Sequence, residues 1–298
     1  MASLSQWVQG ARPKTLPAAL APVAAGTGAA VWQLESLAGG ADWGLVASRA
    51  LLALAVSFSL QIGVNFANDY SDGIRGTDDD RVGPFRLTGS GAARPAIVKR
   101  AAIAALALGG LFGVALVVVA QLWWALIVGA AAIAAAWFYT GGRKPYGYLG
   151  LGEVFVFVFF GLVAVNGTAL AISGAFSWVA LLASIAIGLL AVALMLTNNL
   201  RDIPTDAVSG KRTLAVRLGE HGTRTLYTAT LLVPFVLMVP VIIAHWPAAL
   251  VLLALPLAIG PVRTVRAGAA GRDLIPVLGA TGRLELVFSV LLLLGLVL

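Results

Sequence analysis

Residues Val154–Leu200 read VFVFVFFGLVAVNGTALAISGAFSWVALLASIAIGLLAVALMLTNNL, a run of 47 residues without a charged side chain. A helix crosses the roughly 30 Å hydrocarbon core of a bilayer with about 20 apolar residues, so this run is long enough for two such helices. The segment Ser173-Gly-Ala-Phe-Ser177, near its middle, predicts the turn between them. The run therefore predicts an integral membrane protein built from helices.

Runs of the same kind lie on both sides of it. They are Thr15–Leu34, Ala50–Asn68, Ala101–Gly142, Thr225–Val262 and Pro276–Leu298, the last of which takes Arg283 and Glu285 near its start. Their lengths suit one, one, two, two and one helix respectively. With the central pair, the sequence predicts an all-α bundle of nine transmembrane helices.

Composition agrees with this prediction and excludes other classes. The chain is 60% hydrophobic and only 11% charged, whereas soluble domains carry roughly 25% charged residues. Disordered chains are polar and are also excluded. The net charge of +7 on so apolar a chain reflects membrane topology rather than a nucleic-acid partner. With no cysteine and two distant histidines, thiolate sites and a Ser-His-Asp triad are not expected.

The charges are segregated between the predicted loops. Nineteen of the 20 basic residues fall in the N-terminal segment and in the loops after predicted helices 2, 4, 6 and 8, and Arg49 is the exception. The positive-inside rule therefore predicts a cytoplasmic N-terminus and a C-terminus outside. All acidic residues except Glu35 and Asp42 fall on the same side. That rule requires no acidic excess, so these residues need another explanation.

Two acidic clusters stand at the cytoplasmic ends of predicted helices 2 and 6. Asn65, Asn68/Asp69 and Asp72 are spaced i, i+3/i+4, i+7, which places them on one helix face. Asn198/Asn199, Asp202 and Asp206 repeat nearly the same spacing. Such residues also cap helices, but two matching clusters on one membrane side favour a site. Carboxylate and amide oxygens suit Mg²⁺ together with substrate phosphate, and the interleaved Arg and Lys suit a polyanion.

At these residues the chain resembles the UbiA superfamily of intramembrane prenyltransferases. Asn68-Asp69-x-x-Asp72 is similar to the start of the family's NDxxDxxxD motif, with Gly76 in place of the last Asp and Asp78 two residues later. Asn199-x-x-Asp202-x-x-x-Asp206 is similar to its DxxDxxxD motif, with Asn first. The resemblance implies one membrane prenyltransferase domain over residues 1–298, with two related four-helix halves and Asp-rich motifs near 65–81 and 198–213.

Further stretches resemble the branch that prenylates 1,4-dihydroxy-2-naphthoate. They are Gly10–Leu16, Asn68–Asp78, Leu151–Glu153 and Asn198–Thr213. This implies transfer of a polyprenyl group from its diphosphate to that acceptor, with decarboxylation and diphosphate release, giving demethylmenaquinone or demethylmenaquinol. It also implies two Mg²⁺ ions and a bacterial cytoplasmic membrane, with the site facing the cytoplasm.

Two alternatives stay open at this point. Another aromatic acceptor, such as 4-hydroxybenzoate, fits the same motifs. A cation-coupled transporter is disfavoured, because the acidic groups lie at one membrane face and not near the midplane. The sequence does not indicate the oligomeric state.

Residue chemistry and the resemblance together assign the expected roles. The catalytic residues are Asp72, Asp202, Lys144 and Glu153, although Glu153 equally suits the N-terminal charge of a helix. The metal ligands are Asn68, Asp69, Asp72, Asp78, Asn199, Asp202 and Asp206. The diphosphate is expected to contact Arg12, Lys14, Asn65, Arg75, Arg81, Arg143, Lys144, Tyr146, Lys211 and Arg212. The aromatic acceptor is expected to contact Asn198, Arg201, Tyr70 and Tyr148.

Overall fold

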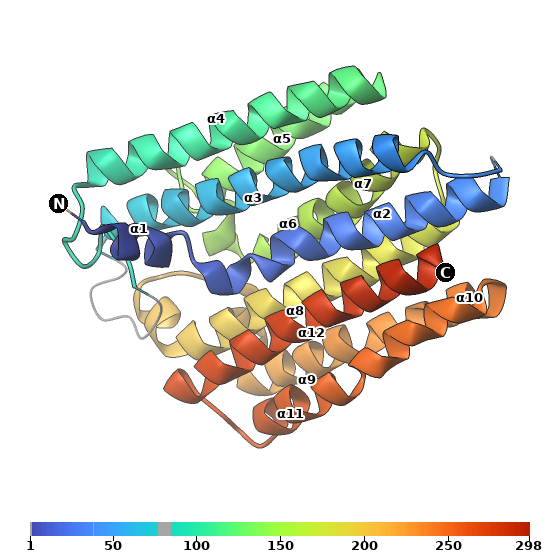
Figure 1. The fold of residues 1–298 in the computed structure, drawn as a ribbon. Coiled ribbons are helices and arrows are strands. Elements are labelled where there is room, and N and C mark those ends of the chain that lie inside the picture. Colours follow the sequence, from blue (N-terminus) through green and yellow to red (C-terminus); the bar gives the residue numbers. More distant parts are fainter. Residues whose placement is uncertain (1, 38, 77–84) are drawn as a thin grey trace.

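The computed structural model describes residues 2–37, 39–76 and 85–298, which form helices joined by short loops with no β-strand among them (Figure 1). The first part of the chain forms α1 (Leu4–Gly10), η1 (Pro13–Thr15), α2 (Pro17–Leu37), α3 (Trp43–Gly73), α4 (Pro95–Ala120) and α5 (Ala125–Phe138). The middle part forms η2 (Tyr146–Leu149), α6 (Gly152–Val156), η3 (Phe157–Val163), α7 (Ala164–Ser173) and α8 (Trp178–Val208). The last part forms α9 (Leu214–Leu237), α10 (Val239–Ala244), η4 (Trp246–Ala254), α11 (Pro256–Arg266), η5 (Gly271–Asp273) and α12 (Leu274–Val297). The prediction of an all-helical protein is confirmed.

Seven helices of the described chain are long and apolar enough to cross a membrane. They are Trp43–Gly73, Pro95–Ala120, Gly152–Ser173, Trp178–Val208, Leu214–Ala244, Trp246–Arg266 and Gly271–Val297. The N-terminal pair Leu4–Thr15 and Pro17–Ser36, bent by 48°, makes an eighth if it is one span. The remaining predicted helix corresponds to α5, which has only 14 residues. It is short because α4 extends to Ala120 and the turn after it uses several more residues of the same apolar run.

Helix α8 forms the centre of the bundle. In the hydrophobic window of α8, 72% of the residues are buried, against 22–50% in the other six spans. It packs between α2, α9, α12 and the α6–η3–α7 helix (Figure 1). A helix that is apolar on all sides is expected in such an interior position.

The α6–η3–α7 helix crosses α8 with little space between the backbones. A Cβ atom on Gly161 would lie 2.6 Å from the Cα of Gly188 and 2.6 Å from the carbonyl oxygen of Ser184. Small residues allow such close approach, which is a common way for helices to associate in lipid. Around Gly161, residues Phe157–Val163 form a π-helical segment, a geometry that is frequent near functional sites.

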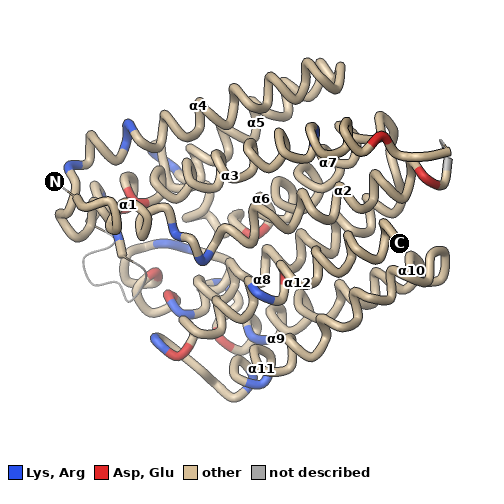
Figure 2. The backbone as a smooth tube through the Cα atoms, in the orientation of Figure 1, with Lys and Arg blue, Asp and Glu red and all other residues tan. Residues whose placement is uncertain are grey.

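Most charged residues lie toward the end of the bundle that carries α1 (Figure 2). Arg49 lies toward the other end, where its guanidinium donates to backbone carbonyls of Ala171 (2.8 Å), Ile172 (3.3 Å) and Val119 (3.0 Å). These carbonyls belong to the last turns of α4 and α7, which lack helical partners and carry partial negative charge. The exception in the charge pattern therefore ties three helices together.

Replacing Gly161 with Ala is expected to lower the thermal unfolding midpoint of the protein in detergent. The added methyl group must displace the α8 backbone, and overpacking of this kind costs about 1–3 kcal/mol. Gly167→Ala is the matched control on the same helix, because no heavy atom lies within 4 Å of its Cβ position. Equal midpoints for the two variants would contradict the close crossing.

Candidate functional site

Both predicted acidic clusters line one cavity of about 1380 Å³. Its polar end is formed by the ends of α3 and α8 and by the loops beside them. From there the cavity continues through apolar residues toward the opposite end of the bundle, where Trp124, Phe176 and Trp178 line it. A single space therefore joins a charged chamber to a long apolar channel.

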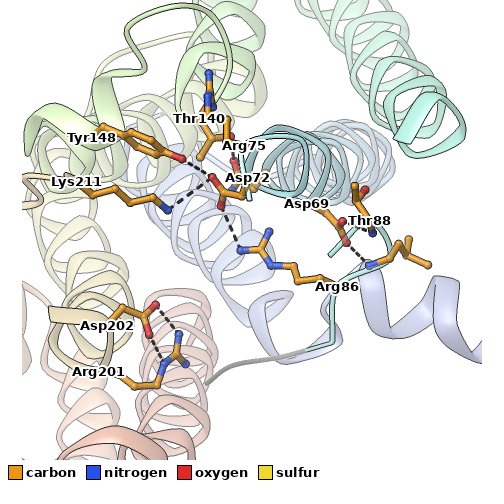
Figure 3. Close-up of polar contacts among 12 residues, drawn as sticks. Asp69, Asp72, Arg75, Arg86, Thr88, Thr140, Tyr148, Arg201, Asp202 and Lys211 are labelled. Atoms are coloured by element: carbon orange, nitrogen blue, oxygen red, sulfur yellow. Dashed lines mark hydrogen bonds and ion pairs between the residues drawn. The ribbon is translucent and has the colours of Figure 1, made fainter. Parts of the chain in front are cut away.

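Helix α3 is continuous through Gly73, so its polar residues take the faces that their spacing predicts. Asn65, Asn68 and Asp72 all line the cavity. Asp69 is turned by about 100° from Asn68 and does not line it. Its two carboxylate oxygens accept backbone N–H groups of Leu87 at 2.6 Å and Thr88 at 2.8 Å (Figure 3). Asp69 thus anchors the segment that follows residue 84.

Asp72 connects several parts of the chain at the chamber. Its side chain, 5% exposed, accepts the Tyr148 hydroxyl at 2.8 Å and pairs with Arg86 at 3.4 Å and Lys211 at 3.7 Å (Figure 3). The Lys211 ammonium also lies 4.6 Å from the centre of the Tyr148 ring. The carboxylate of α3 is therefore joined to the loops before α6 and after α8.

The second cluster lies on α8, and its residues line the same chamber. Asp202 forms a bidentate pair with Arg201, with Nε at 2.7 Å and Nη2 at 2.8 Å (Figure 3). Asn199 donates its amide to Glu153 at 2.8 Å. Asp206, 9% exposed, also lines the cavity.

The turn between α1 and α2 presents two cations to the chamber. Arg12 has a left-handed backbone (φ 57°), which is uncommon for a residue other than glycine. The turn is held by Asn65, which donates to the Ala11 carbonyl at 2.9 Å and to the Thr15 hydroxyl at 3.1 Å. As a result, both Arg12 and Lys14 line the cavity. Strain of this kind is often found at functional sites.

Hydrogen bonds join the segments around residues 140–149 and 209–217 beside the chamber. Arg212 donates its backbone N–H to the Tyr148 carbonyl at 3.0 Å, and Arg217 donates to the Leu149 carbonyl at 3.0 Å. Arg75 donates to the carbonyls of Thr140 and Gly142. All of these acceptors are backbone carbonyls, and none of the three arginines lines the cavity, so the contacts leave the cavity-lining side chains unused.

A row of aromatic rings leads from the chamber into the apolar channel. Ring centres are 5.6 Å apart for Tyr139 and Tyr146, 4.0 Å for Tyr146 and Phe155, and 6.0 Å for Phe155 and Phe159. All four line the cavity. Burial raises the pKa of the Tyr146 phenol, which stays neutral and donates to the Ala135 carbonyl at 2.8 Å.

Most predicted site residues meet at the cavity. Those lining it are Arg12, Lys14, Asn65, Asn68, Asp72, Tyr146, Tyr148, Asn198, Asn199, Arg201, Asp202, Asp206 and Lys211. Those that do not are Asp69, Tyr70, Arg75, Arg143, Lys144, Glu153 and Arg212. Asp78 and Arg81 lie outside the described residues.

The predicted residues away from the cavity have identifiable positions. Arg143, Lys144 and Arg212 are exposed on the loops. Tyr70 packs beside Trp137, with ring centres 6.4 Å apart. Spacing in the sequence did not predict four further residues that line the cavity, namely Gln61, Arg86, Tyr139 and Thr140. Thr140 donates to the Asn68 amide oxygen at 2.8 Å, a contact across 72 residues for which the sequence carries no local signal.

The oxygen donors of the chamber suit Mg²⁺ only in combination with a substrate. Among the described residues, no group of three or more Asp, Glu, His or Cys side chains lies close enough to hold a metal alone. Mg²⁺ is commonly bound through one or two carboxylates, with waters and substrate phosphates completing the shell. Asp72 and Asp202 already take cationic partners here, and Asn68 and Asn199 line the same cavity. The residues therefore fit a metal that arrives with a phosphorylated ligand.

An all-helical membrane bundle with a charged chamber opening into a long apolar channel is typical of enzymes that act on the head group of a lipid. The chain belongs to the UbiA prenyltransferase family, whose model matches residues 18–273. The family resemblance stated from the motifs is thus confirmed.

Named relatives and solved structures agree with this membership. The chain is 54% identical to a 1,4-dihydroxy-2-naphthoate octaprenyltransferase of Mycobacterium tuberculosis, over 97% of this chain and 96% of that one. It is 43% identical to the Escherichia coli protein of the same name, over 76% and 72%. A UbiA homologue from Aeropyrum pernix K1 matches with a TM-score of 0.69 at 18% identity, over 91% and 94%. A homologue from Archaeoglobus fulgidus, solved with GPP and Mg²⁺, matches with 0.64 at 15%, over 96% and 99%.

Asp69→Asn is expected to lower the thermal unfolding midpoint without any ligand present. The amide would place an NH₂ group against one of the two backbone N–H donors, and losing a hydrogen bond to a charged group costs about 1.5–3 kcal/mol. Asp273→Asn, on an exposed turn, is the control and should leave the midpoint unchanged. An unchanged midpoint for Asp69→Asn would show that Asp69 does not anchor residues 87 and 88.

Proposed function

We propose that this protein transfers a polyprenyl group from its diphosphate to 1,4-dihydroxy-2-naphthoate. A new bond joins the allylic carbon to the ring carbon that carries the carboxylate, and the allylic C–O bond breaks. Diphosphate leaves with that electron pair, and the carboxylate leaves as CO₂. The observation that carries the proposal is the single cavity, in which a chamber lined by Asp, Arg and Lys side chains continues into an apolar channel. The names of the relatives supply the acceptor.

The ligands proposed for Mg²⁺ are the cavity-lining oxygens of α3 and α8. They are Asn68, Asp72, Asn199, Asp202 and Asp206. When bound, two Mg²⁺ ions would neutralise the charge that develops on the departing diphosphate. Asp69 is not included, because both of its oxygens accept backbone N–H groups.

Cationic side chains of the chamber supply the remaining charge for the diphosphate. Lys211 and Arg86 stand beside Asp72, and Arg12 and Lys14 enter from the N-terminal turn. Charge-assisted hydrogen bonds to phosphate oxygens are among the stronger polar interactions. Because these donors are held in place before the reaction, they stabilise the leaving group without reorganisation.

The apolar channel is proposed to hold the prenyl tail and to keep water from the allylic carbon. The aromatic row from Tyr139 to Phe159 lies where the tail meets the chamber, and ring faces attract positive charge. Exclusion of water protects a reactive allylic centre from hydrolysis. Asn198, Arg201 and Tyr148 line the same cavity and remain the proposed contacts of the acceptor.

Asp72→Ala and Asp202→Ala are each expected to reduce Mg²⁺-dependent diphosphate release by about 100-fold or more, the loss seen when a preorganised charge-stabilising group is removed. The assay contains purified protein, a polyprenyl diphosphate and 1,4-dihydroxy-2-naphthoate. Asp273→Ala serves as the exposed control and should retain full activity.

The same assay with 4-hydroxybenzoate decides the acceptor. Faster turnover of the hydroxybenzoate would assign another branch of the family. Wild-type protein that releases no diphosphate with either acceptor would overturn the enzyme assignment. The cation-coupled transporter would then be the alternative to test.

We propose nine crossings, with the charged end and the chamber in the cytoplasm of a bacterium. Arg49 contacts Val119 near one end of the bundle, and Arg75 contacts Thr140 at the charged end. The chain between Val119 and Thr140 therefore runs from end to end, which supports α5 as a crossing despite its length. We further propose that residues 1–298 act as one unit, because α3 and α8 complete one chamber.

The absence of cysteine allows a direct test of this orientation. Ser209→Cys at the charged end should react with a membrane-impermeant maleimide only in inside-out vesicles. Ser36→Cys, near the other end, should react in intact cells. The opposite pattern would reverse the proposed topology. Reaction of both positions from one side would exclude an odd number of crossings between residues 36 and 209, and with it the proposed count.

A further inference from the structure

Glu153 lies directly behind the chamber rather than in it. It occupies the first turn of α6, is 4% exposed, and does not line the cavity. Its carboxylate oxygen Oε1 accepts a hydrogen bond from Nδ2 of Asn199 at 2.8 Å. Asn199 itself does line the cavity. Asn199 therefore connects Glu153 to the chamber.

We propose that Glu153 is a positioning residue that fixes the amide of Asn199 with its carbonyl oxygen toward the chamber, an inference that rests on the proposed function. A carboxylate only accepts hydrogen bonds, so the amide must present its NH₂ group to Glu153. The amide oxygen then points away from Glu153. Asn199 becomes an oriented oxygen donor for the metal and diphosphate, although an unconstrained amide presents N–H and C=O equally well.

The packing of the two helices holds this pair in register. A Cβ atom on Gly152 would lie 3.1 Å from Sδ of Met195, which precedes Asn199 by one turn of α8. Farther from the chamber on the same two helices, the backbones also approach closely at Gly161 and Gly188. This close packing of Gly152 against α8 keeps the neighbouring Glu153 within hydrogen-bond distance of Asn199. Outer-shell partners of this kind orient metal ligands, and their loss commonly costs about 10–100-fold in affinity or activity.

The pair also accounts for the departure of this chain from the family's DxxDxxxD pattern. A carboxylate in place of the Asn199 amide would stand against Glu153 at hydrogen-bond distance. Like charges in a buried site repel strongly. The amide of Asn199 and the carboxylate of Glu153 are therefore complementary choices, and neither is expected to tolerate replacement while the other is kept.

The test exchanges the two chemical groups. Glu153→Gln and Asn199→Asp are made singly and together, and each protein is measured for its unfolding midpoint in detergent without Mg²⁺ or substrate. Asn199→Asp alone should unfold several degrees lower than wild type. The double variant should regain most of that loss, because the amide introduced on α6 can donate to the carboxylate introduced on α8. Asp273→Asn, an exposed acid-to-amide change, is the control and should not change the midpoint.

The Mg²⁺ concentration for half-maximal diphosphate release, with geranyl diphosphate and the naphthoate, is the second readout. Glu153→Gln should raise it about 10-fold, the lower end of outer-shell effects. The double variant should bring it to the wild-type value or below, since a carboxylate oxygen then faces the chamber. A merely structural Glu153 would not shift this concentration.

Two results would overturn the positioning role. One is a double variant whose loss in midpoint equals the sum of the two single losses. The other is a Glu153→Gln protein with unchanged Mg²⁺ dependence. If wild-type protein has no activity, the proposed function fails. The ligand-free midpoints still test the pairing of Glu153 with Asn199, so the two failures are distinguishable.

Discussion

A carboxylate buried at the end of an apolar bundle must have partners, and Asp72 takes them from separate parts of the chain. Breaking such a buried pair by removing one partner costs about 3–5 kcal/mol, because the remaining charge is left without compensation. Tyr148 comes from the segment before α6, Lys211 from the segment after α8, and Arg86 from the segment before α4. One carboxylate therefore contacts all three of these segments beside the chamber. This arrangement also keeps the cations near the position that a diphosphate would occupy.

The membrane character of the chain and the faces of its polar helices could be predicted from sequence. Charge-free length is a direct consequence of bilayer thickness, and the i, i+3/i+4, i+7 spacing of Asn65, Asn68 and Asp72 has one outcome on a continuous helix. The spacing could not separate Asp69 from its neighbours, because its partners, Leu87 and Thr88, are backbone groups of a distant loop. Nor could it show that Glu153 stands behind Asn199.

The span count shows a different limit. The length of a charge-free run indicates how many residues can lie inside the membrane. It does not indicate where the helices begin and end. α4 begins at Pro95, a residue suited to the first turn of a helix, and thus starts before the run does. The 14-residue α5 is what remains of the run after α4 and the turn. Helix boundaries depend on proline and on turns, which the charge pattern ignores.

The apolar channel has a thermodynamic consequence for substrate choice. A prenyl tail moving from lipid to this channel leaves one hydrocarbon-like environment for another, so water is not released along its length. Helices in lipid likewise gain no hydrophobic driving force from contact with each other. Binding energy must then come from the charged head group, with Asp72 and its cations at the centre. Lengthening the tail by one isoprene unit should therefore change affinity little.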